Sequence, residues 1–84
     1  MRAEWMRPVD DLILEFLRDE SLSTPEVISE EIGRNRNYVT QRCSELYEYG
    51  LVTKIARGVY KLTENGEAYL DEELDANELE ANEN

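Results

Sequence analysis

Polar side chains suited to recognition are gathered in residues 35–49, a stretch whose apolar positions follow a helical period. Each residue advances about 100° around a helix, so the buried stripe would be Val39, Cys43 and Leu46. The opposite face then presents amide and hydroxyl groups between two guanidinium groups: Asn37, Thr40, Gln41 and Ser44, with Arg36 and Arg42 beside them. Amides can bond adenine, guanidinium groups can bond guanine or phosphate, and hydroxyls can bond several bases. This face therefore predicts contact with the major groove of double-stranded DNA.

A second group of basic residues follows this stretch. Arg57 lies beside Gly58 in a predicted hairpin turn at 56–58, where it can reach backbone phosphate or the minor groove. Lys54 and Lys61 lie on the two strands that flank the turn and can face phosphates. The complete set of predicted DNA-binding residues is Arg34, Arg36, Asn37, Thr40, Gln41, Arg42, Ser44, Lys54, Arg57 and Lys61.

The charge of the chain is strongly acidic and unevenly distributed. The 84 residues carry 20 Asp and Glu against 9 Lys and Arg, a net charge of −11. Residues 33–61 nevertheless carry six basic and two acidic side chains, a net charge of +4. The overall acidity indicates adaptation to molar salt, where the Debye length is roughly 3 Å and like charges barely repel. Intrinsic disorder, a DNA mimic and a protein with an acidic tail are the alternative explanations.

The composition argues against an enzyme. The chain has no histidine, which excludes catalytic schemes that depend on that side chain. It has no glycine-rich phosphate loop. Cys43 falls on the apolar stripe, so we expect a buried structural thiol. The acidic cluster Asp71, Glu72, Glu73 and Asp75 lacks the spacing of a calcium loop. We expect no catalytic residue, no cofactor, no metal and no small-molecule substrate.

The sequence predicts a cytoplasmic protein without a membrane segment. No run approaches the roughly 18 consecutive apolar residues of a membrane span. The first residues lack the apolar run of a signal peptide, and a single cysteine cannot form an internal disulfide.

Three helices are predicted in the first half of the chain. The first follows Pro8, with an inward stripe of Val9, Leu12, Ile13, Phe16 and Leu17. The second begins at Thr24-Pro25-Glu26, a sequence typical of a helix start, and ends at Gly33. Its inward residues are Val27, Ile28 and Ile32. The third covers about 35–49 and ends at Gly50.

A hairpin and a fourth helix are predicted in the second half. Strand-like runs at 51–55 and 59–62 flank the turn at 56–58. Thr63 can cap a helix over 64–74, in which Gly66 weakens the first turn. This order predicts an α+β fold, a winged helix-turn-helix with a three-helix core, a two-stranded β-hairpin wing and a C-terminal helix. The domain would cover 1–74, and 75–84 would form an acidic C-terminal tail.

A symmetric homodimer is also expected, because two-fold proteins read two DNA half-sites about one helical turn apart. The candidate interface residues are Trp5, Met6, Tyr69, Leu70 and Leu74. These side chains could instead complete the core of a single chain.

Several motifs spread over most of the chain resemble one family. They include Trp5-Met6, residues 8–17, Thr24-Pro25, Tyr49-Gly50-Leu51-Val52, Gly58-Val59-Tyr60, Leu62-Thr63 and residues 73–76. In these motifs the chain resembles the haloarchaeal winged-helix proteins related to the repressor of the halophage phi-H. The resemblance implies a DNA-binding regulator that acts as a repressor in a haloarchaeon. The chain is more distantly similar to the MarR-type regulators, which bind DNA as dimers, but it lacks their long flanking helices.

The predicted function is sequence-specific regulation of transcription on double-stranded DNA. The helix at 35–49 would read the major groove, and the turn at 56–58 would contact phosphate or the minor groove. The alternative is a winged-helix module that docks on proteins without binding DNA, which would favour an exposed apolar patch on that helix. RNA is a third possibility, but an exposed aromatic platform is not evident in the sequence.

Overall fold

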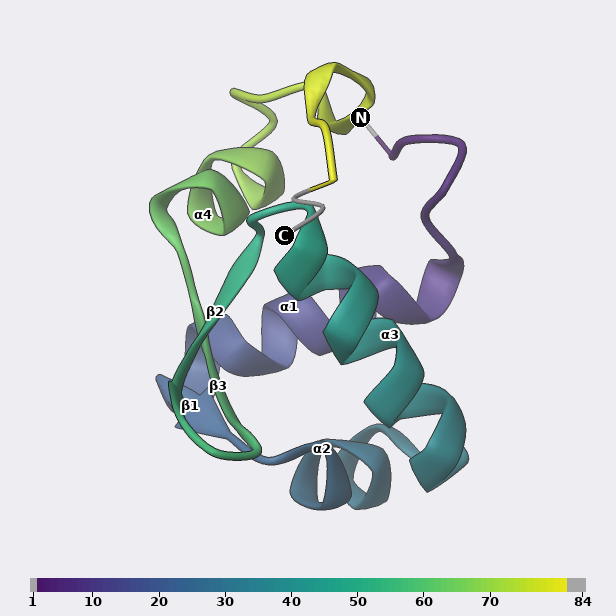
Figure 1. Cartoon of the computed structure of the whole chain (residues 1–84). Coiled ribbons are helices and arrows are strands. Elements are labelled where there is room, and N and C mark those ends of the chain that lie inside the picture. The colour runs from purple at the N-terminus through teal and green to yellow at the C-terminus, as the bar shows by residue number, and fades with distance from the viewer. Residues whose placement is uncertain (1, 82–84) are drawn as a thin grey trace.

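The chain folds in the predicted order of helices and strands, with one additional strand and one additional short helix (Figure 1). The computed structural model describes residues 2–81. Its elements are α1 (Pro8–Glu20), β1 (Leu22–Ser23), α2 (Pro25–Ile32), α3 (Arg36–Glu48), β2 (Val52–Ala56), β3 (Val59–Leu62), α4 (Glu64–Leu70) and the 3-10 helix η1 (Ala76–Glu78). The predicted α+β class is confirmed.

Side-chain caps fix the start of each helix in the central pair. The Thr24 hydroxyl oxygen accepts a hydrogen bond from the Val27 N–H at 3.3 Å at the start of α2. The Asn35 side-chain oxygen accepts from the Tyr38 N–H at 3.0 Å at the start of α3. Between them, Gly33 adopts a left-handed φ of 69°, a conformation that a side chain would disfavour. The tight turn between α2 and α3 therefore follows from residues that the sequence itself displays.

The sheet has three strands rather than the two predicted. Its order is β1-β3-β2, and both pairings are antiparallel. Leu22 and Ser23 of β1 pair with Lys61 and Tyr60 of β3. A strand of two residues shows no alternation along the sequence, so β1 could not be recognised from its pattern. It ties the base of the wing to the connection between α1 and α2.

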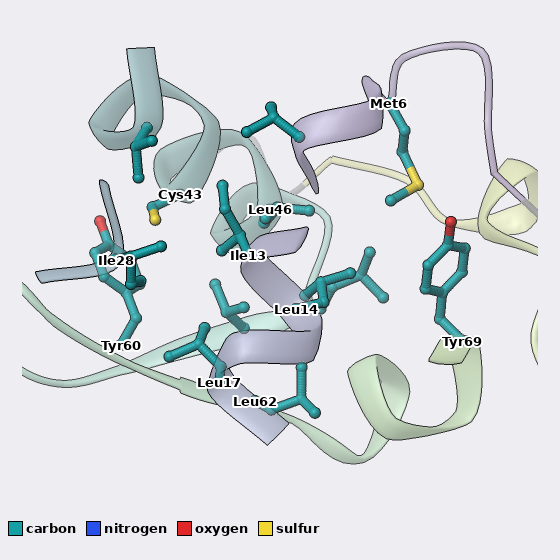
Figure 2. Packing of buried hydrophobic residues seen from close by; sticks show 14 of the residues in the cluster. Met6, Ile13, Leu14, Leu17, Ile28, Cys43, Leu46, Tyr60, Leu62 and Tyr69 are labelled. Atoms are coloured by element: carbon teal, nitrogen blue, oxygen red, sulfur yellow. The ribbon is translucent and has the colours of Figure 1, made fainter. Parts of the chain in front are cut away.

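The core is built around α1, which lies between α3 and the sheet (Figure 2). Its largest fully buried apolar side chains are Ile13, Leu14, Leu17, Ile28, Val39, Cys43, Leu46, Leu51 and Val52. Two residues predicted to face inward are exposed instead, Leu12 at 38% and Val27 at 45%. The buried stripe of α1 is rotated toward Asp10, and that of α2 toward Ser29. The prediction failed there because it placed apolar side chains on the inner face and did not consider buried polar ones.

A buried ion pair joins α1 to α3. Arg42 Nε donates to Asp10 Oδ1 at 2.9 Å, and Arg42 Nη2 donates to Asp10 Oδ2 at 2.8 Å. The same Nη2 donates to the Trp5 carbonyl oxygen at 3.0 Å, and Asp10 Oδ2 accepts from the Arg7 backbone N–H at 2.9 Å. Asp10 is 0% exposed and Arg42 is 9% exposed. The hydrogen bonds to Asp10 raise the pKa of Arg42, so the guanidinium stays charged inside the protein.

Segments near the two ends of the described chain meet at the top of Figure 1. Ala3 and Ala76 are both buried, and the Glu4 N–H donates to the Asn77 side-chain oxygen at 3.3 Å. Leu79 also packs against the core. Within the described residues, packed structure thus extends past the predicted boundary at residue 74, because α4 ends at Leu70 and η1 follows it. Residues 82–84 of the predicted tail lie outside the described residues.

The predicted dimer residues are largely used within one chain. Met6 is 4% exposed and Tyr69 is 7% exposed, so their assignment to a subunit interface is corrected to the core. Trp5 stacks on Tyr49 with ring centroids 3.7 Å apart. Leu70 and Leu74 pack partly against the core. An 84-residue chain needs these apolar groups to complete its own interior.

Removing one partner of the buried ion pair should strongly destabilise the fold. We expect Asp10→Ala to lower the free energy of unfolding by about 3–5 kcal/mol, because it leaves the Arg42 charge buried and unpaired. Urea unfolding in molar KCl measures this difference. The exposed Asp19→Ala on the same helix is the control, with an expected change within about 0.5 kcal/mol. The double variant Asp10→Leu/Arg42→Met should lose less stability than Asp10→Ala, and the reverse order would contradict the burial argument.

Gly66 should tolerate no side chain. A Cβ at this position would meet the Leu51 carbonyl oxygen and would lie 2.5 Å from Leu62 Cδ1. We expect Gly66→Ala to destabilise the protein by about 1–3 kcal/mol through overpacking, although alanine is the better helix former by about 1 kcal/mol. The exposed neighbour Asn65→Ala serves as the control in the same urea experiment. A Gly66→Ala protein as stable as the wild type would refute the close approach of α4 to the sheet.

Candidate nucleic-acid interface

The outer face of α3 exposes the polar side chains that its period predicts. Four of them are exposed to solvent: Asn37, Thr40, Gln41 and Ser44. The inner face of the same helix is fully buried, with Val39, Cys43 and Leu46 at 0% exposure. The Thr40 hydroxyl donates to the Arg36 carbonyl oxygen at 2.9 Å, which fixes the orientation of this side chain. The helix therefore presents a row of hydrogen-bonding groups above a rigid core.

Arg34 lies in the turn that precedes α3. Its Nη1 donates to the carbonyl oxygens of Ile32 and Gly33, at 3.1 Å and 3.4 Å. These bonds satisfy carbonyl groups at the end of α2. Arg34 is exposed, so it both supports the turn and adds positive charge beside the start of α3.

The wing tip lies against the starts of α2 and α3. Arg57 and Gly58 line a shallow depression of about 350 Å³ together with residues of the two helices: Thr24, Pro25, Glu26, Arg36 and Thr40. Figure 1 shows the turn between β2 and β3 next to α2. Arg36 and Arg57, both predicted to contact DNA, thus border the same depression although they are 21 positions apart in the sequence.

Lys54 is held against aromatic rings at the base of the wing. Its ammonium lies 4.8 Å from the centre of the Tyr47 ring and 6.0 Å from that of Tyr60. Such contacts attract a cation to the ring faces. Lys54 therefore connects β2 to the second half of α3, away from the depression bordered by Arg57.

Lys61 is separated from the other candidates. In the strand register, Lys54 pairs with Tyr60, whereas Lys61 pairs with Thr53 and with Leu22. Alternate residues of a strand point to opposite faces of a sheet. Lys61 thus lies on the face opposite to Lys54 and borders a hollow near Arg18. The structure does not bring Lys61 together with the outer face of α3.

The predicted DNA-binding set must be corrected at Arg42. Its guanidinium is bound to the Asp10 carboxylate inside the protein and is not on the outer face of α3. The period of the helix placed Arg42 at the edge of the polar face, next to the buried stripe. A carboxylate 32 positions earlier decides which way the side chain turns, and the local sequence gives no sign of it.

Cys43 is a structural thiol, as predicted. It is 0% exposed, and burial raises the pKa of its thiol to about 12. The reactive thiolate is therefore negligible near neutral pH.

A polar cluster between α1 and α4 has a structural role. Arg2 Nη2 lies 2.7 Å from Asp11 Oδ2, and the Tyr69 hydroxyl donates to Asp11 Oδ1 at 2.7 Å. Arg18 Nε lies 3.0 Å from Glu67 Oε1. Burial raises the pKa of Tyr69, so the phenol keeps the proton that it donates. Opposite charges in this cluster are paired, and they tie α4 to α1.

Glu26 is the residue of this region that sequence reasoning missed. We assigned it only to the first turn of the second helix. In the structure its Oε2 lies 3.6 Å from Arg36 Nη2 within the depression. Residues 26 and 36 lie on different helices, so only the turn at Gly33 reveals their contact.

Residues 2–81 offer neither a metal-binding cluster nor a membrane-spanning helix. No group of three or more His, Cys, Asp or Glu side chains in this part of the chain is arranged to hold a metal ion. None of its helices combines the length and apolar character needed to span a membrane.

Known proteins match the chain over nearly its whole length. Residues 1–82 match the family described as winged helix-turn-helix phage repressor. The chain is 36% identical over 86 residues to the repressor protein of Halobacterium phage phiH, and the match covers 94% of both proteins.

Solved structures show the same fold. The crystal structure of the PhiH1 repressor-like protein from Haloarcula marismortui matches with a TM-score of 0.87 and 36% identity, over 96% of this chain and 97% of that one. The reduced form of MarR from E. coli matches with a TM-score of 0.74 and 18% identity, over 83% of this chain and 52% of that one. The predicted winged-helix fold and the resemblance to the phi-H repressor group are thus confirmed. The chain belongs to the winged helix-turn-helix phage repressor family.

Proposed function

We propose that this protein binds specific sequences of double-stranded DNA and represses transcription. The observation that carries the proposal is the chemistry of the outer face of α3. Residues 36–44 contain no carboxylate, although the chain has 20 Asp and Glu. This stretch instead exposes amide, hydroxyl and guanidinium groups, which are the groups that bond base edges and phosphates. Membership of a repressor family supports the same conclusion.

In the proposed complex, the first half of α3 lies in the major groove. That groove is about 12 Å wide and admits an α-helix, and the N-terminal residues of the second helix in a helix-turn-helix contact the bases. Asn37 and Gln41 would read base edges, and Arg36 would bond guanine. Arg57 at the wing tip would bond the adjacent backbone or enter the minor groove. The shared depression supports this arrangement, since it keeps Arg36 and Arg57 on one side of the protein.

The net charge of −11 constrains how the protein can bind DNA. Molar salt shortens the Debye length to roughly 3 Å, so distant carboxylates would repel the phosphates only weakly. The same salt removes most of the affinity that comes from counterion release. We propose that base contacts and surface burial supply the larger share of the affinity. Binding should then persist in molar KCl and should depend on salt far less than for lac repressor, whose logarithmic slope is about −10.

The direct test is DNA binding by wild type and by Arg36→Ala/Gln41→Ala/Arg57→Ala. Fluorescence anisotropy in molar KCl would use the DNA upstream of the protein's own gene and, in parallel, a random genomic library. Loss of three contacts worth about 1 kcal/mol or more each predicts an affinity loss of roughly 100-fold or more. Lys61→Ala/Asn65→Ala is the control, since it removes a positive charge and an amide from exposed positions away from the outer face of α3.

The outcomes separate the candidate functions. Tight wild-type binding that is lost only in the first variant supports recognition by α3 and the wing tip. Equal losses in both variants would move the contact surface elsewhere. Absence of binding to both DNA samples, with folded protein shown by circular dichroism, would refute the proposal and favour docking on another protein.

The proposal includes a two-fold homodimer, which would place two copies of α3 about one helical turn of DNA apart. Trp5, Leu70 and Leu74 pack only partly against the core and could also contact a second subunit. Light scattering after size-exclusion chromatography in molar KCl should give twice the chain mass of 9.8 kDa. A single-chain mass in free solution, together with one chain per bound duplex, would contradict the dimer.

A further inference from the structure

Glu26 is the one carboxylate among the described residues that line the depression at the wing tip. Its Oε2 lies 3.6 Å from Arg36 Nη2, and both side chains are largely exposed, at 56% and 66%. The depression also contains Arg57 but no second acidic side chain. The Arg36 charge is thus already partly neutralised before any nucleic acid arrives.

We propose that Glu26 determines specificity by directing Arg36 to base edges and away from phosphate. The inference rests on the proposed function, because it concerns how the same surface distinguishes one DNA from another. A phosphate that bonds Arg36 competes with the Glu26 carboxylate 3.6 Å away, since two anions in direct contact with one guanidinium repel each other. A guanine edge is an uncharged acceptor, and the five donors of a guanidinium can serve it and Glu26 together.

The difference between phosphate and base contacts can be measured through the number of counterions that binding releases. A cation that binds phosphate normally releases about 0.9 counterions from the DNA, and this release is the main source of non-specific affinity. Where phosphate takes the place of Glu26 beside Arg36, the freed carboxylate recruits a cation from solution, which offsets part of that release. Arg36 then contributes less to binding at random sequences, while a base contact at the specific site is unaffected.

Among the described residues, the Glu26 side chain also lies in the first turn of α2, where a negative charge favours the helix. Ser29 Oγ bonds the Glu26 carbonyl oxygen, which a change of side chain leaves in place. Glu26→Gln keeps the shape of the side chain and removes its charge. It is therefore a suitable probe, provided that its unfolding midpoint is measured beside the wild type.

The experiment measures affinity against KCl concentration for a random-sequence duplex and for the specific duplex. Glu26→Gln should steepen the logarithmic salt slope on random DNA by up to about 0.9. The affinity advantage of Glu26→Gln over wild type on random DNA should therefore fall by up to about 3.5-fold between about 0.5 M and about 2 M KCl. The slope on the specific duplex should stay unchanged, so the ratio of specific to random affinity falls. Glu31→Gln, an exposed residue of α2 with the same charge change, is the matched control.

A double-mutant comparison assigns the effect to Arg36. In an Arg36→Ala background, Glu26→Gln should no longer change the slope. The inference would be overturned by an unchanged salt slope in Glu26→Gln, by an equal slope change in Glu31→Gln, or by a slope change that persists without Arg36. In each of these cases, binding by the wild type would still support the proposed function. Failure of the wild type to bind either duplex would overturn both.

Discussion

The position of α3 depends on the buried ion pair between Asp10 and Arg42. The two side chains make two mutual hydrogen bonds, and further bonds to the backbone of Trp5 and Arg7 connect α1, α3 and the N-terminal segment. Because the pair is shielded from solvent, dissolved ions screen it much less than they screen exposed pairs. A buried pair also needs one geometry to satisfy all its partners. It therefore fixes the angle at which α3 presents its outer face, in dilute and in concentrated salt.

The basic residues fall into two groups that the sequence alone does not separate. Arg42 is buried in its ion pair with Asp10, and Lys54 lies against aromatic rings. Lys61 lies on the face of the sheet opposite to Lys54. Of the basic side chains that the structure describes, Arg36 and Arg57 border the depression at the wing tip, and the exposed Arg34 adds its charge beside the start of α3. The net charge of +4 over residues 33–61 thus overstates the charge available on one face. A surface with so few available cations suits recognition through hydrogen bonds better than attraction through charge.

Sequence reasoning succeeded where local patterns decide the structure. The apolar period of α3, the cap at Thr24 and the hairpin turn at 56–58 are all present in short windows, and the structure agrees with them. It failed where the partner is distant in sequence. Arg42 turned inward toward a carboxylate in another helix, and Ala76 became part of the core although it lies between the polar residues Asp75 and Asn77. Gly66 illustrates the same limit, since its role is set by the Leu51 backbone and not by its own helix.

The meeting of the two ends has a consequence for the topology of the molecule. Glu4 and Asn77 are joined by a hydrogen bond although 73 positions separate them, so the described chain nearly closes into a ring. Domains whose ends lie together commonly tolerate circular permutation. A short linker could join the present ends, and a new start could be opened in the exposed turn after α1, near Ser21. Such a rearranged chain would begin just before β1 and would keep α2, α3 and the wing in one uninterrupted segment.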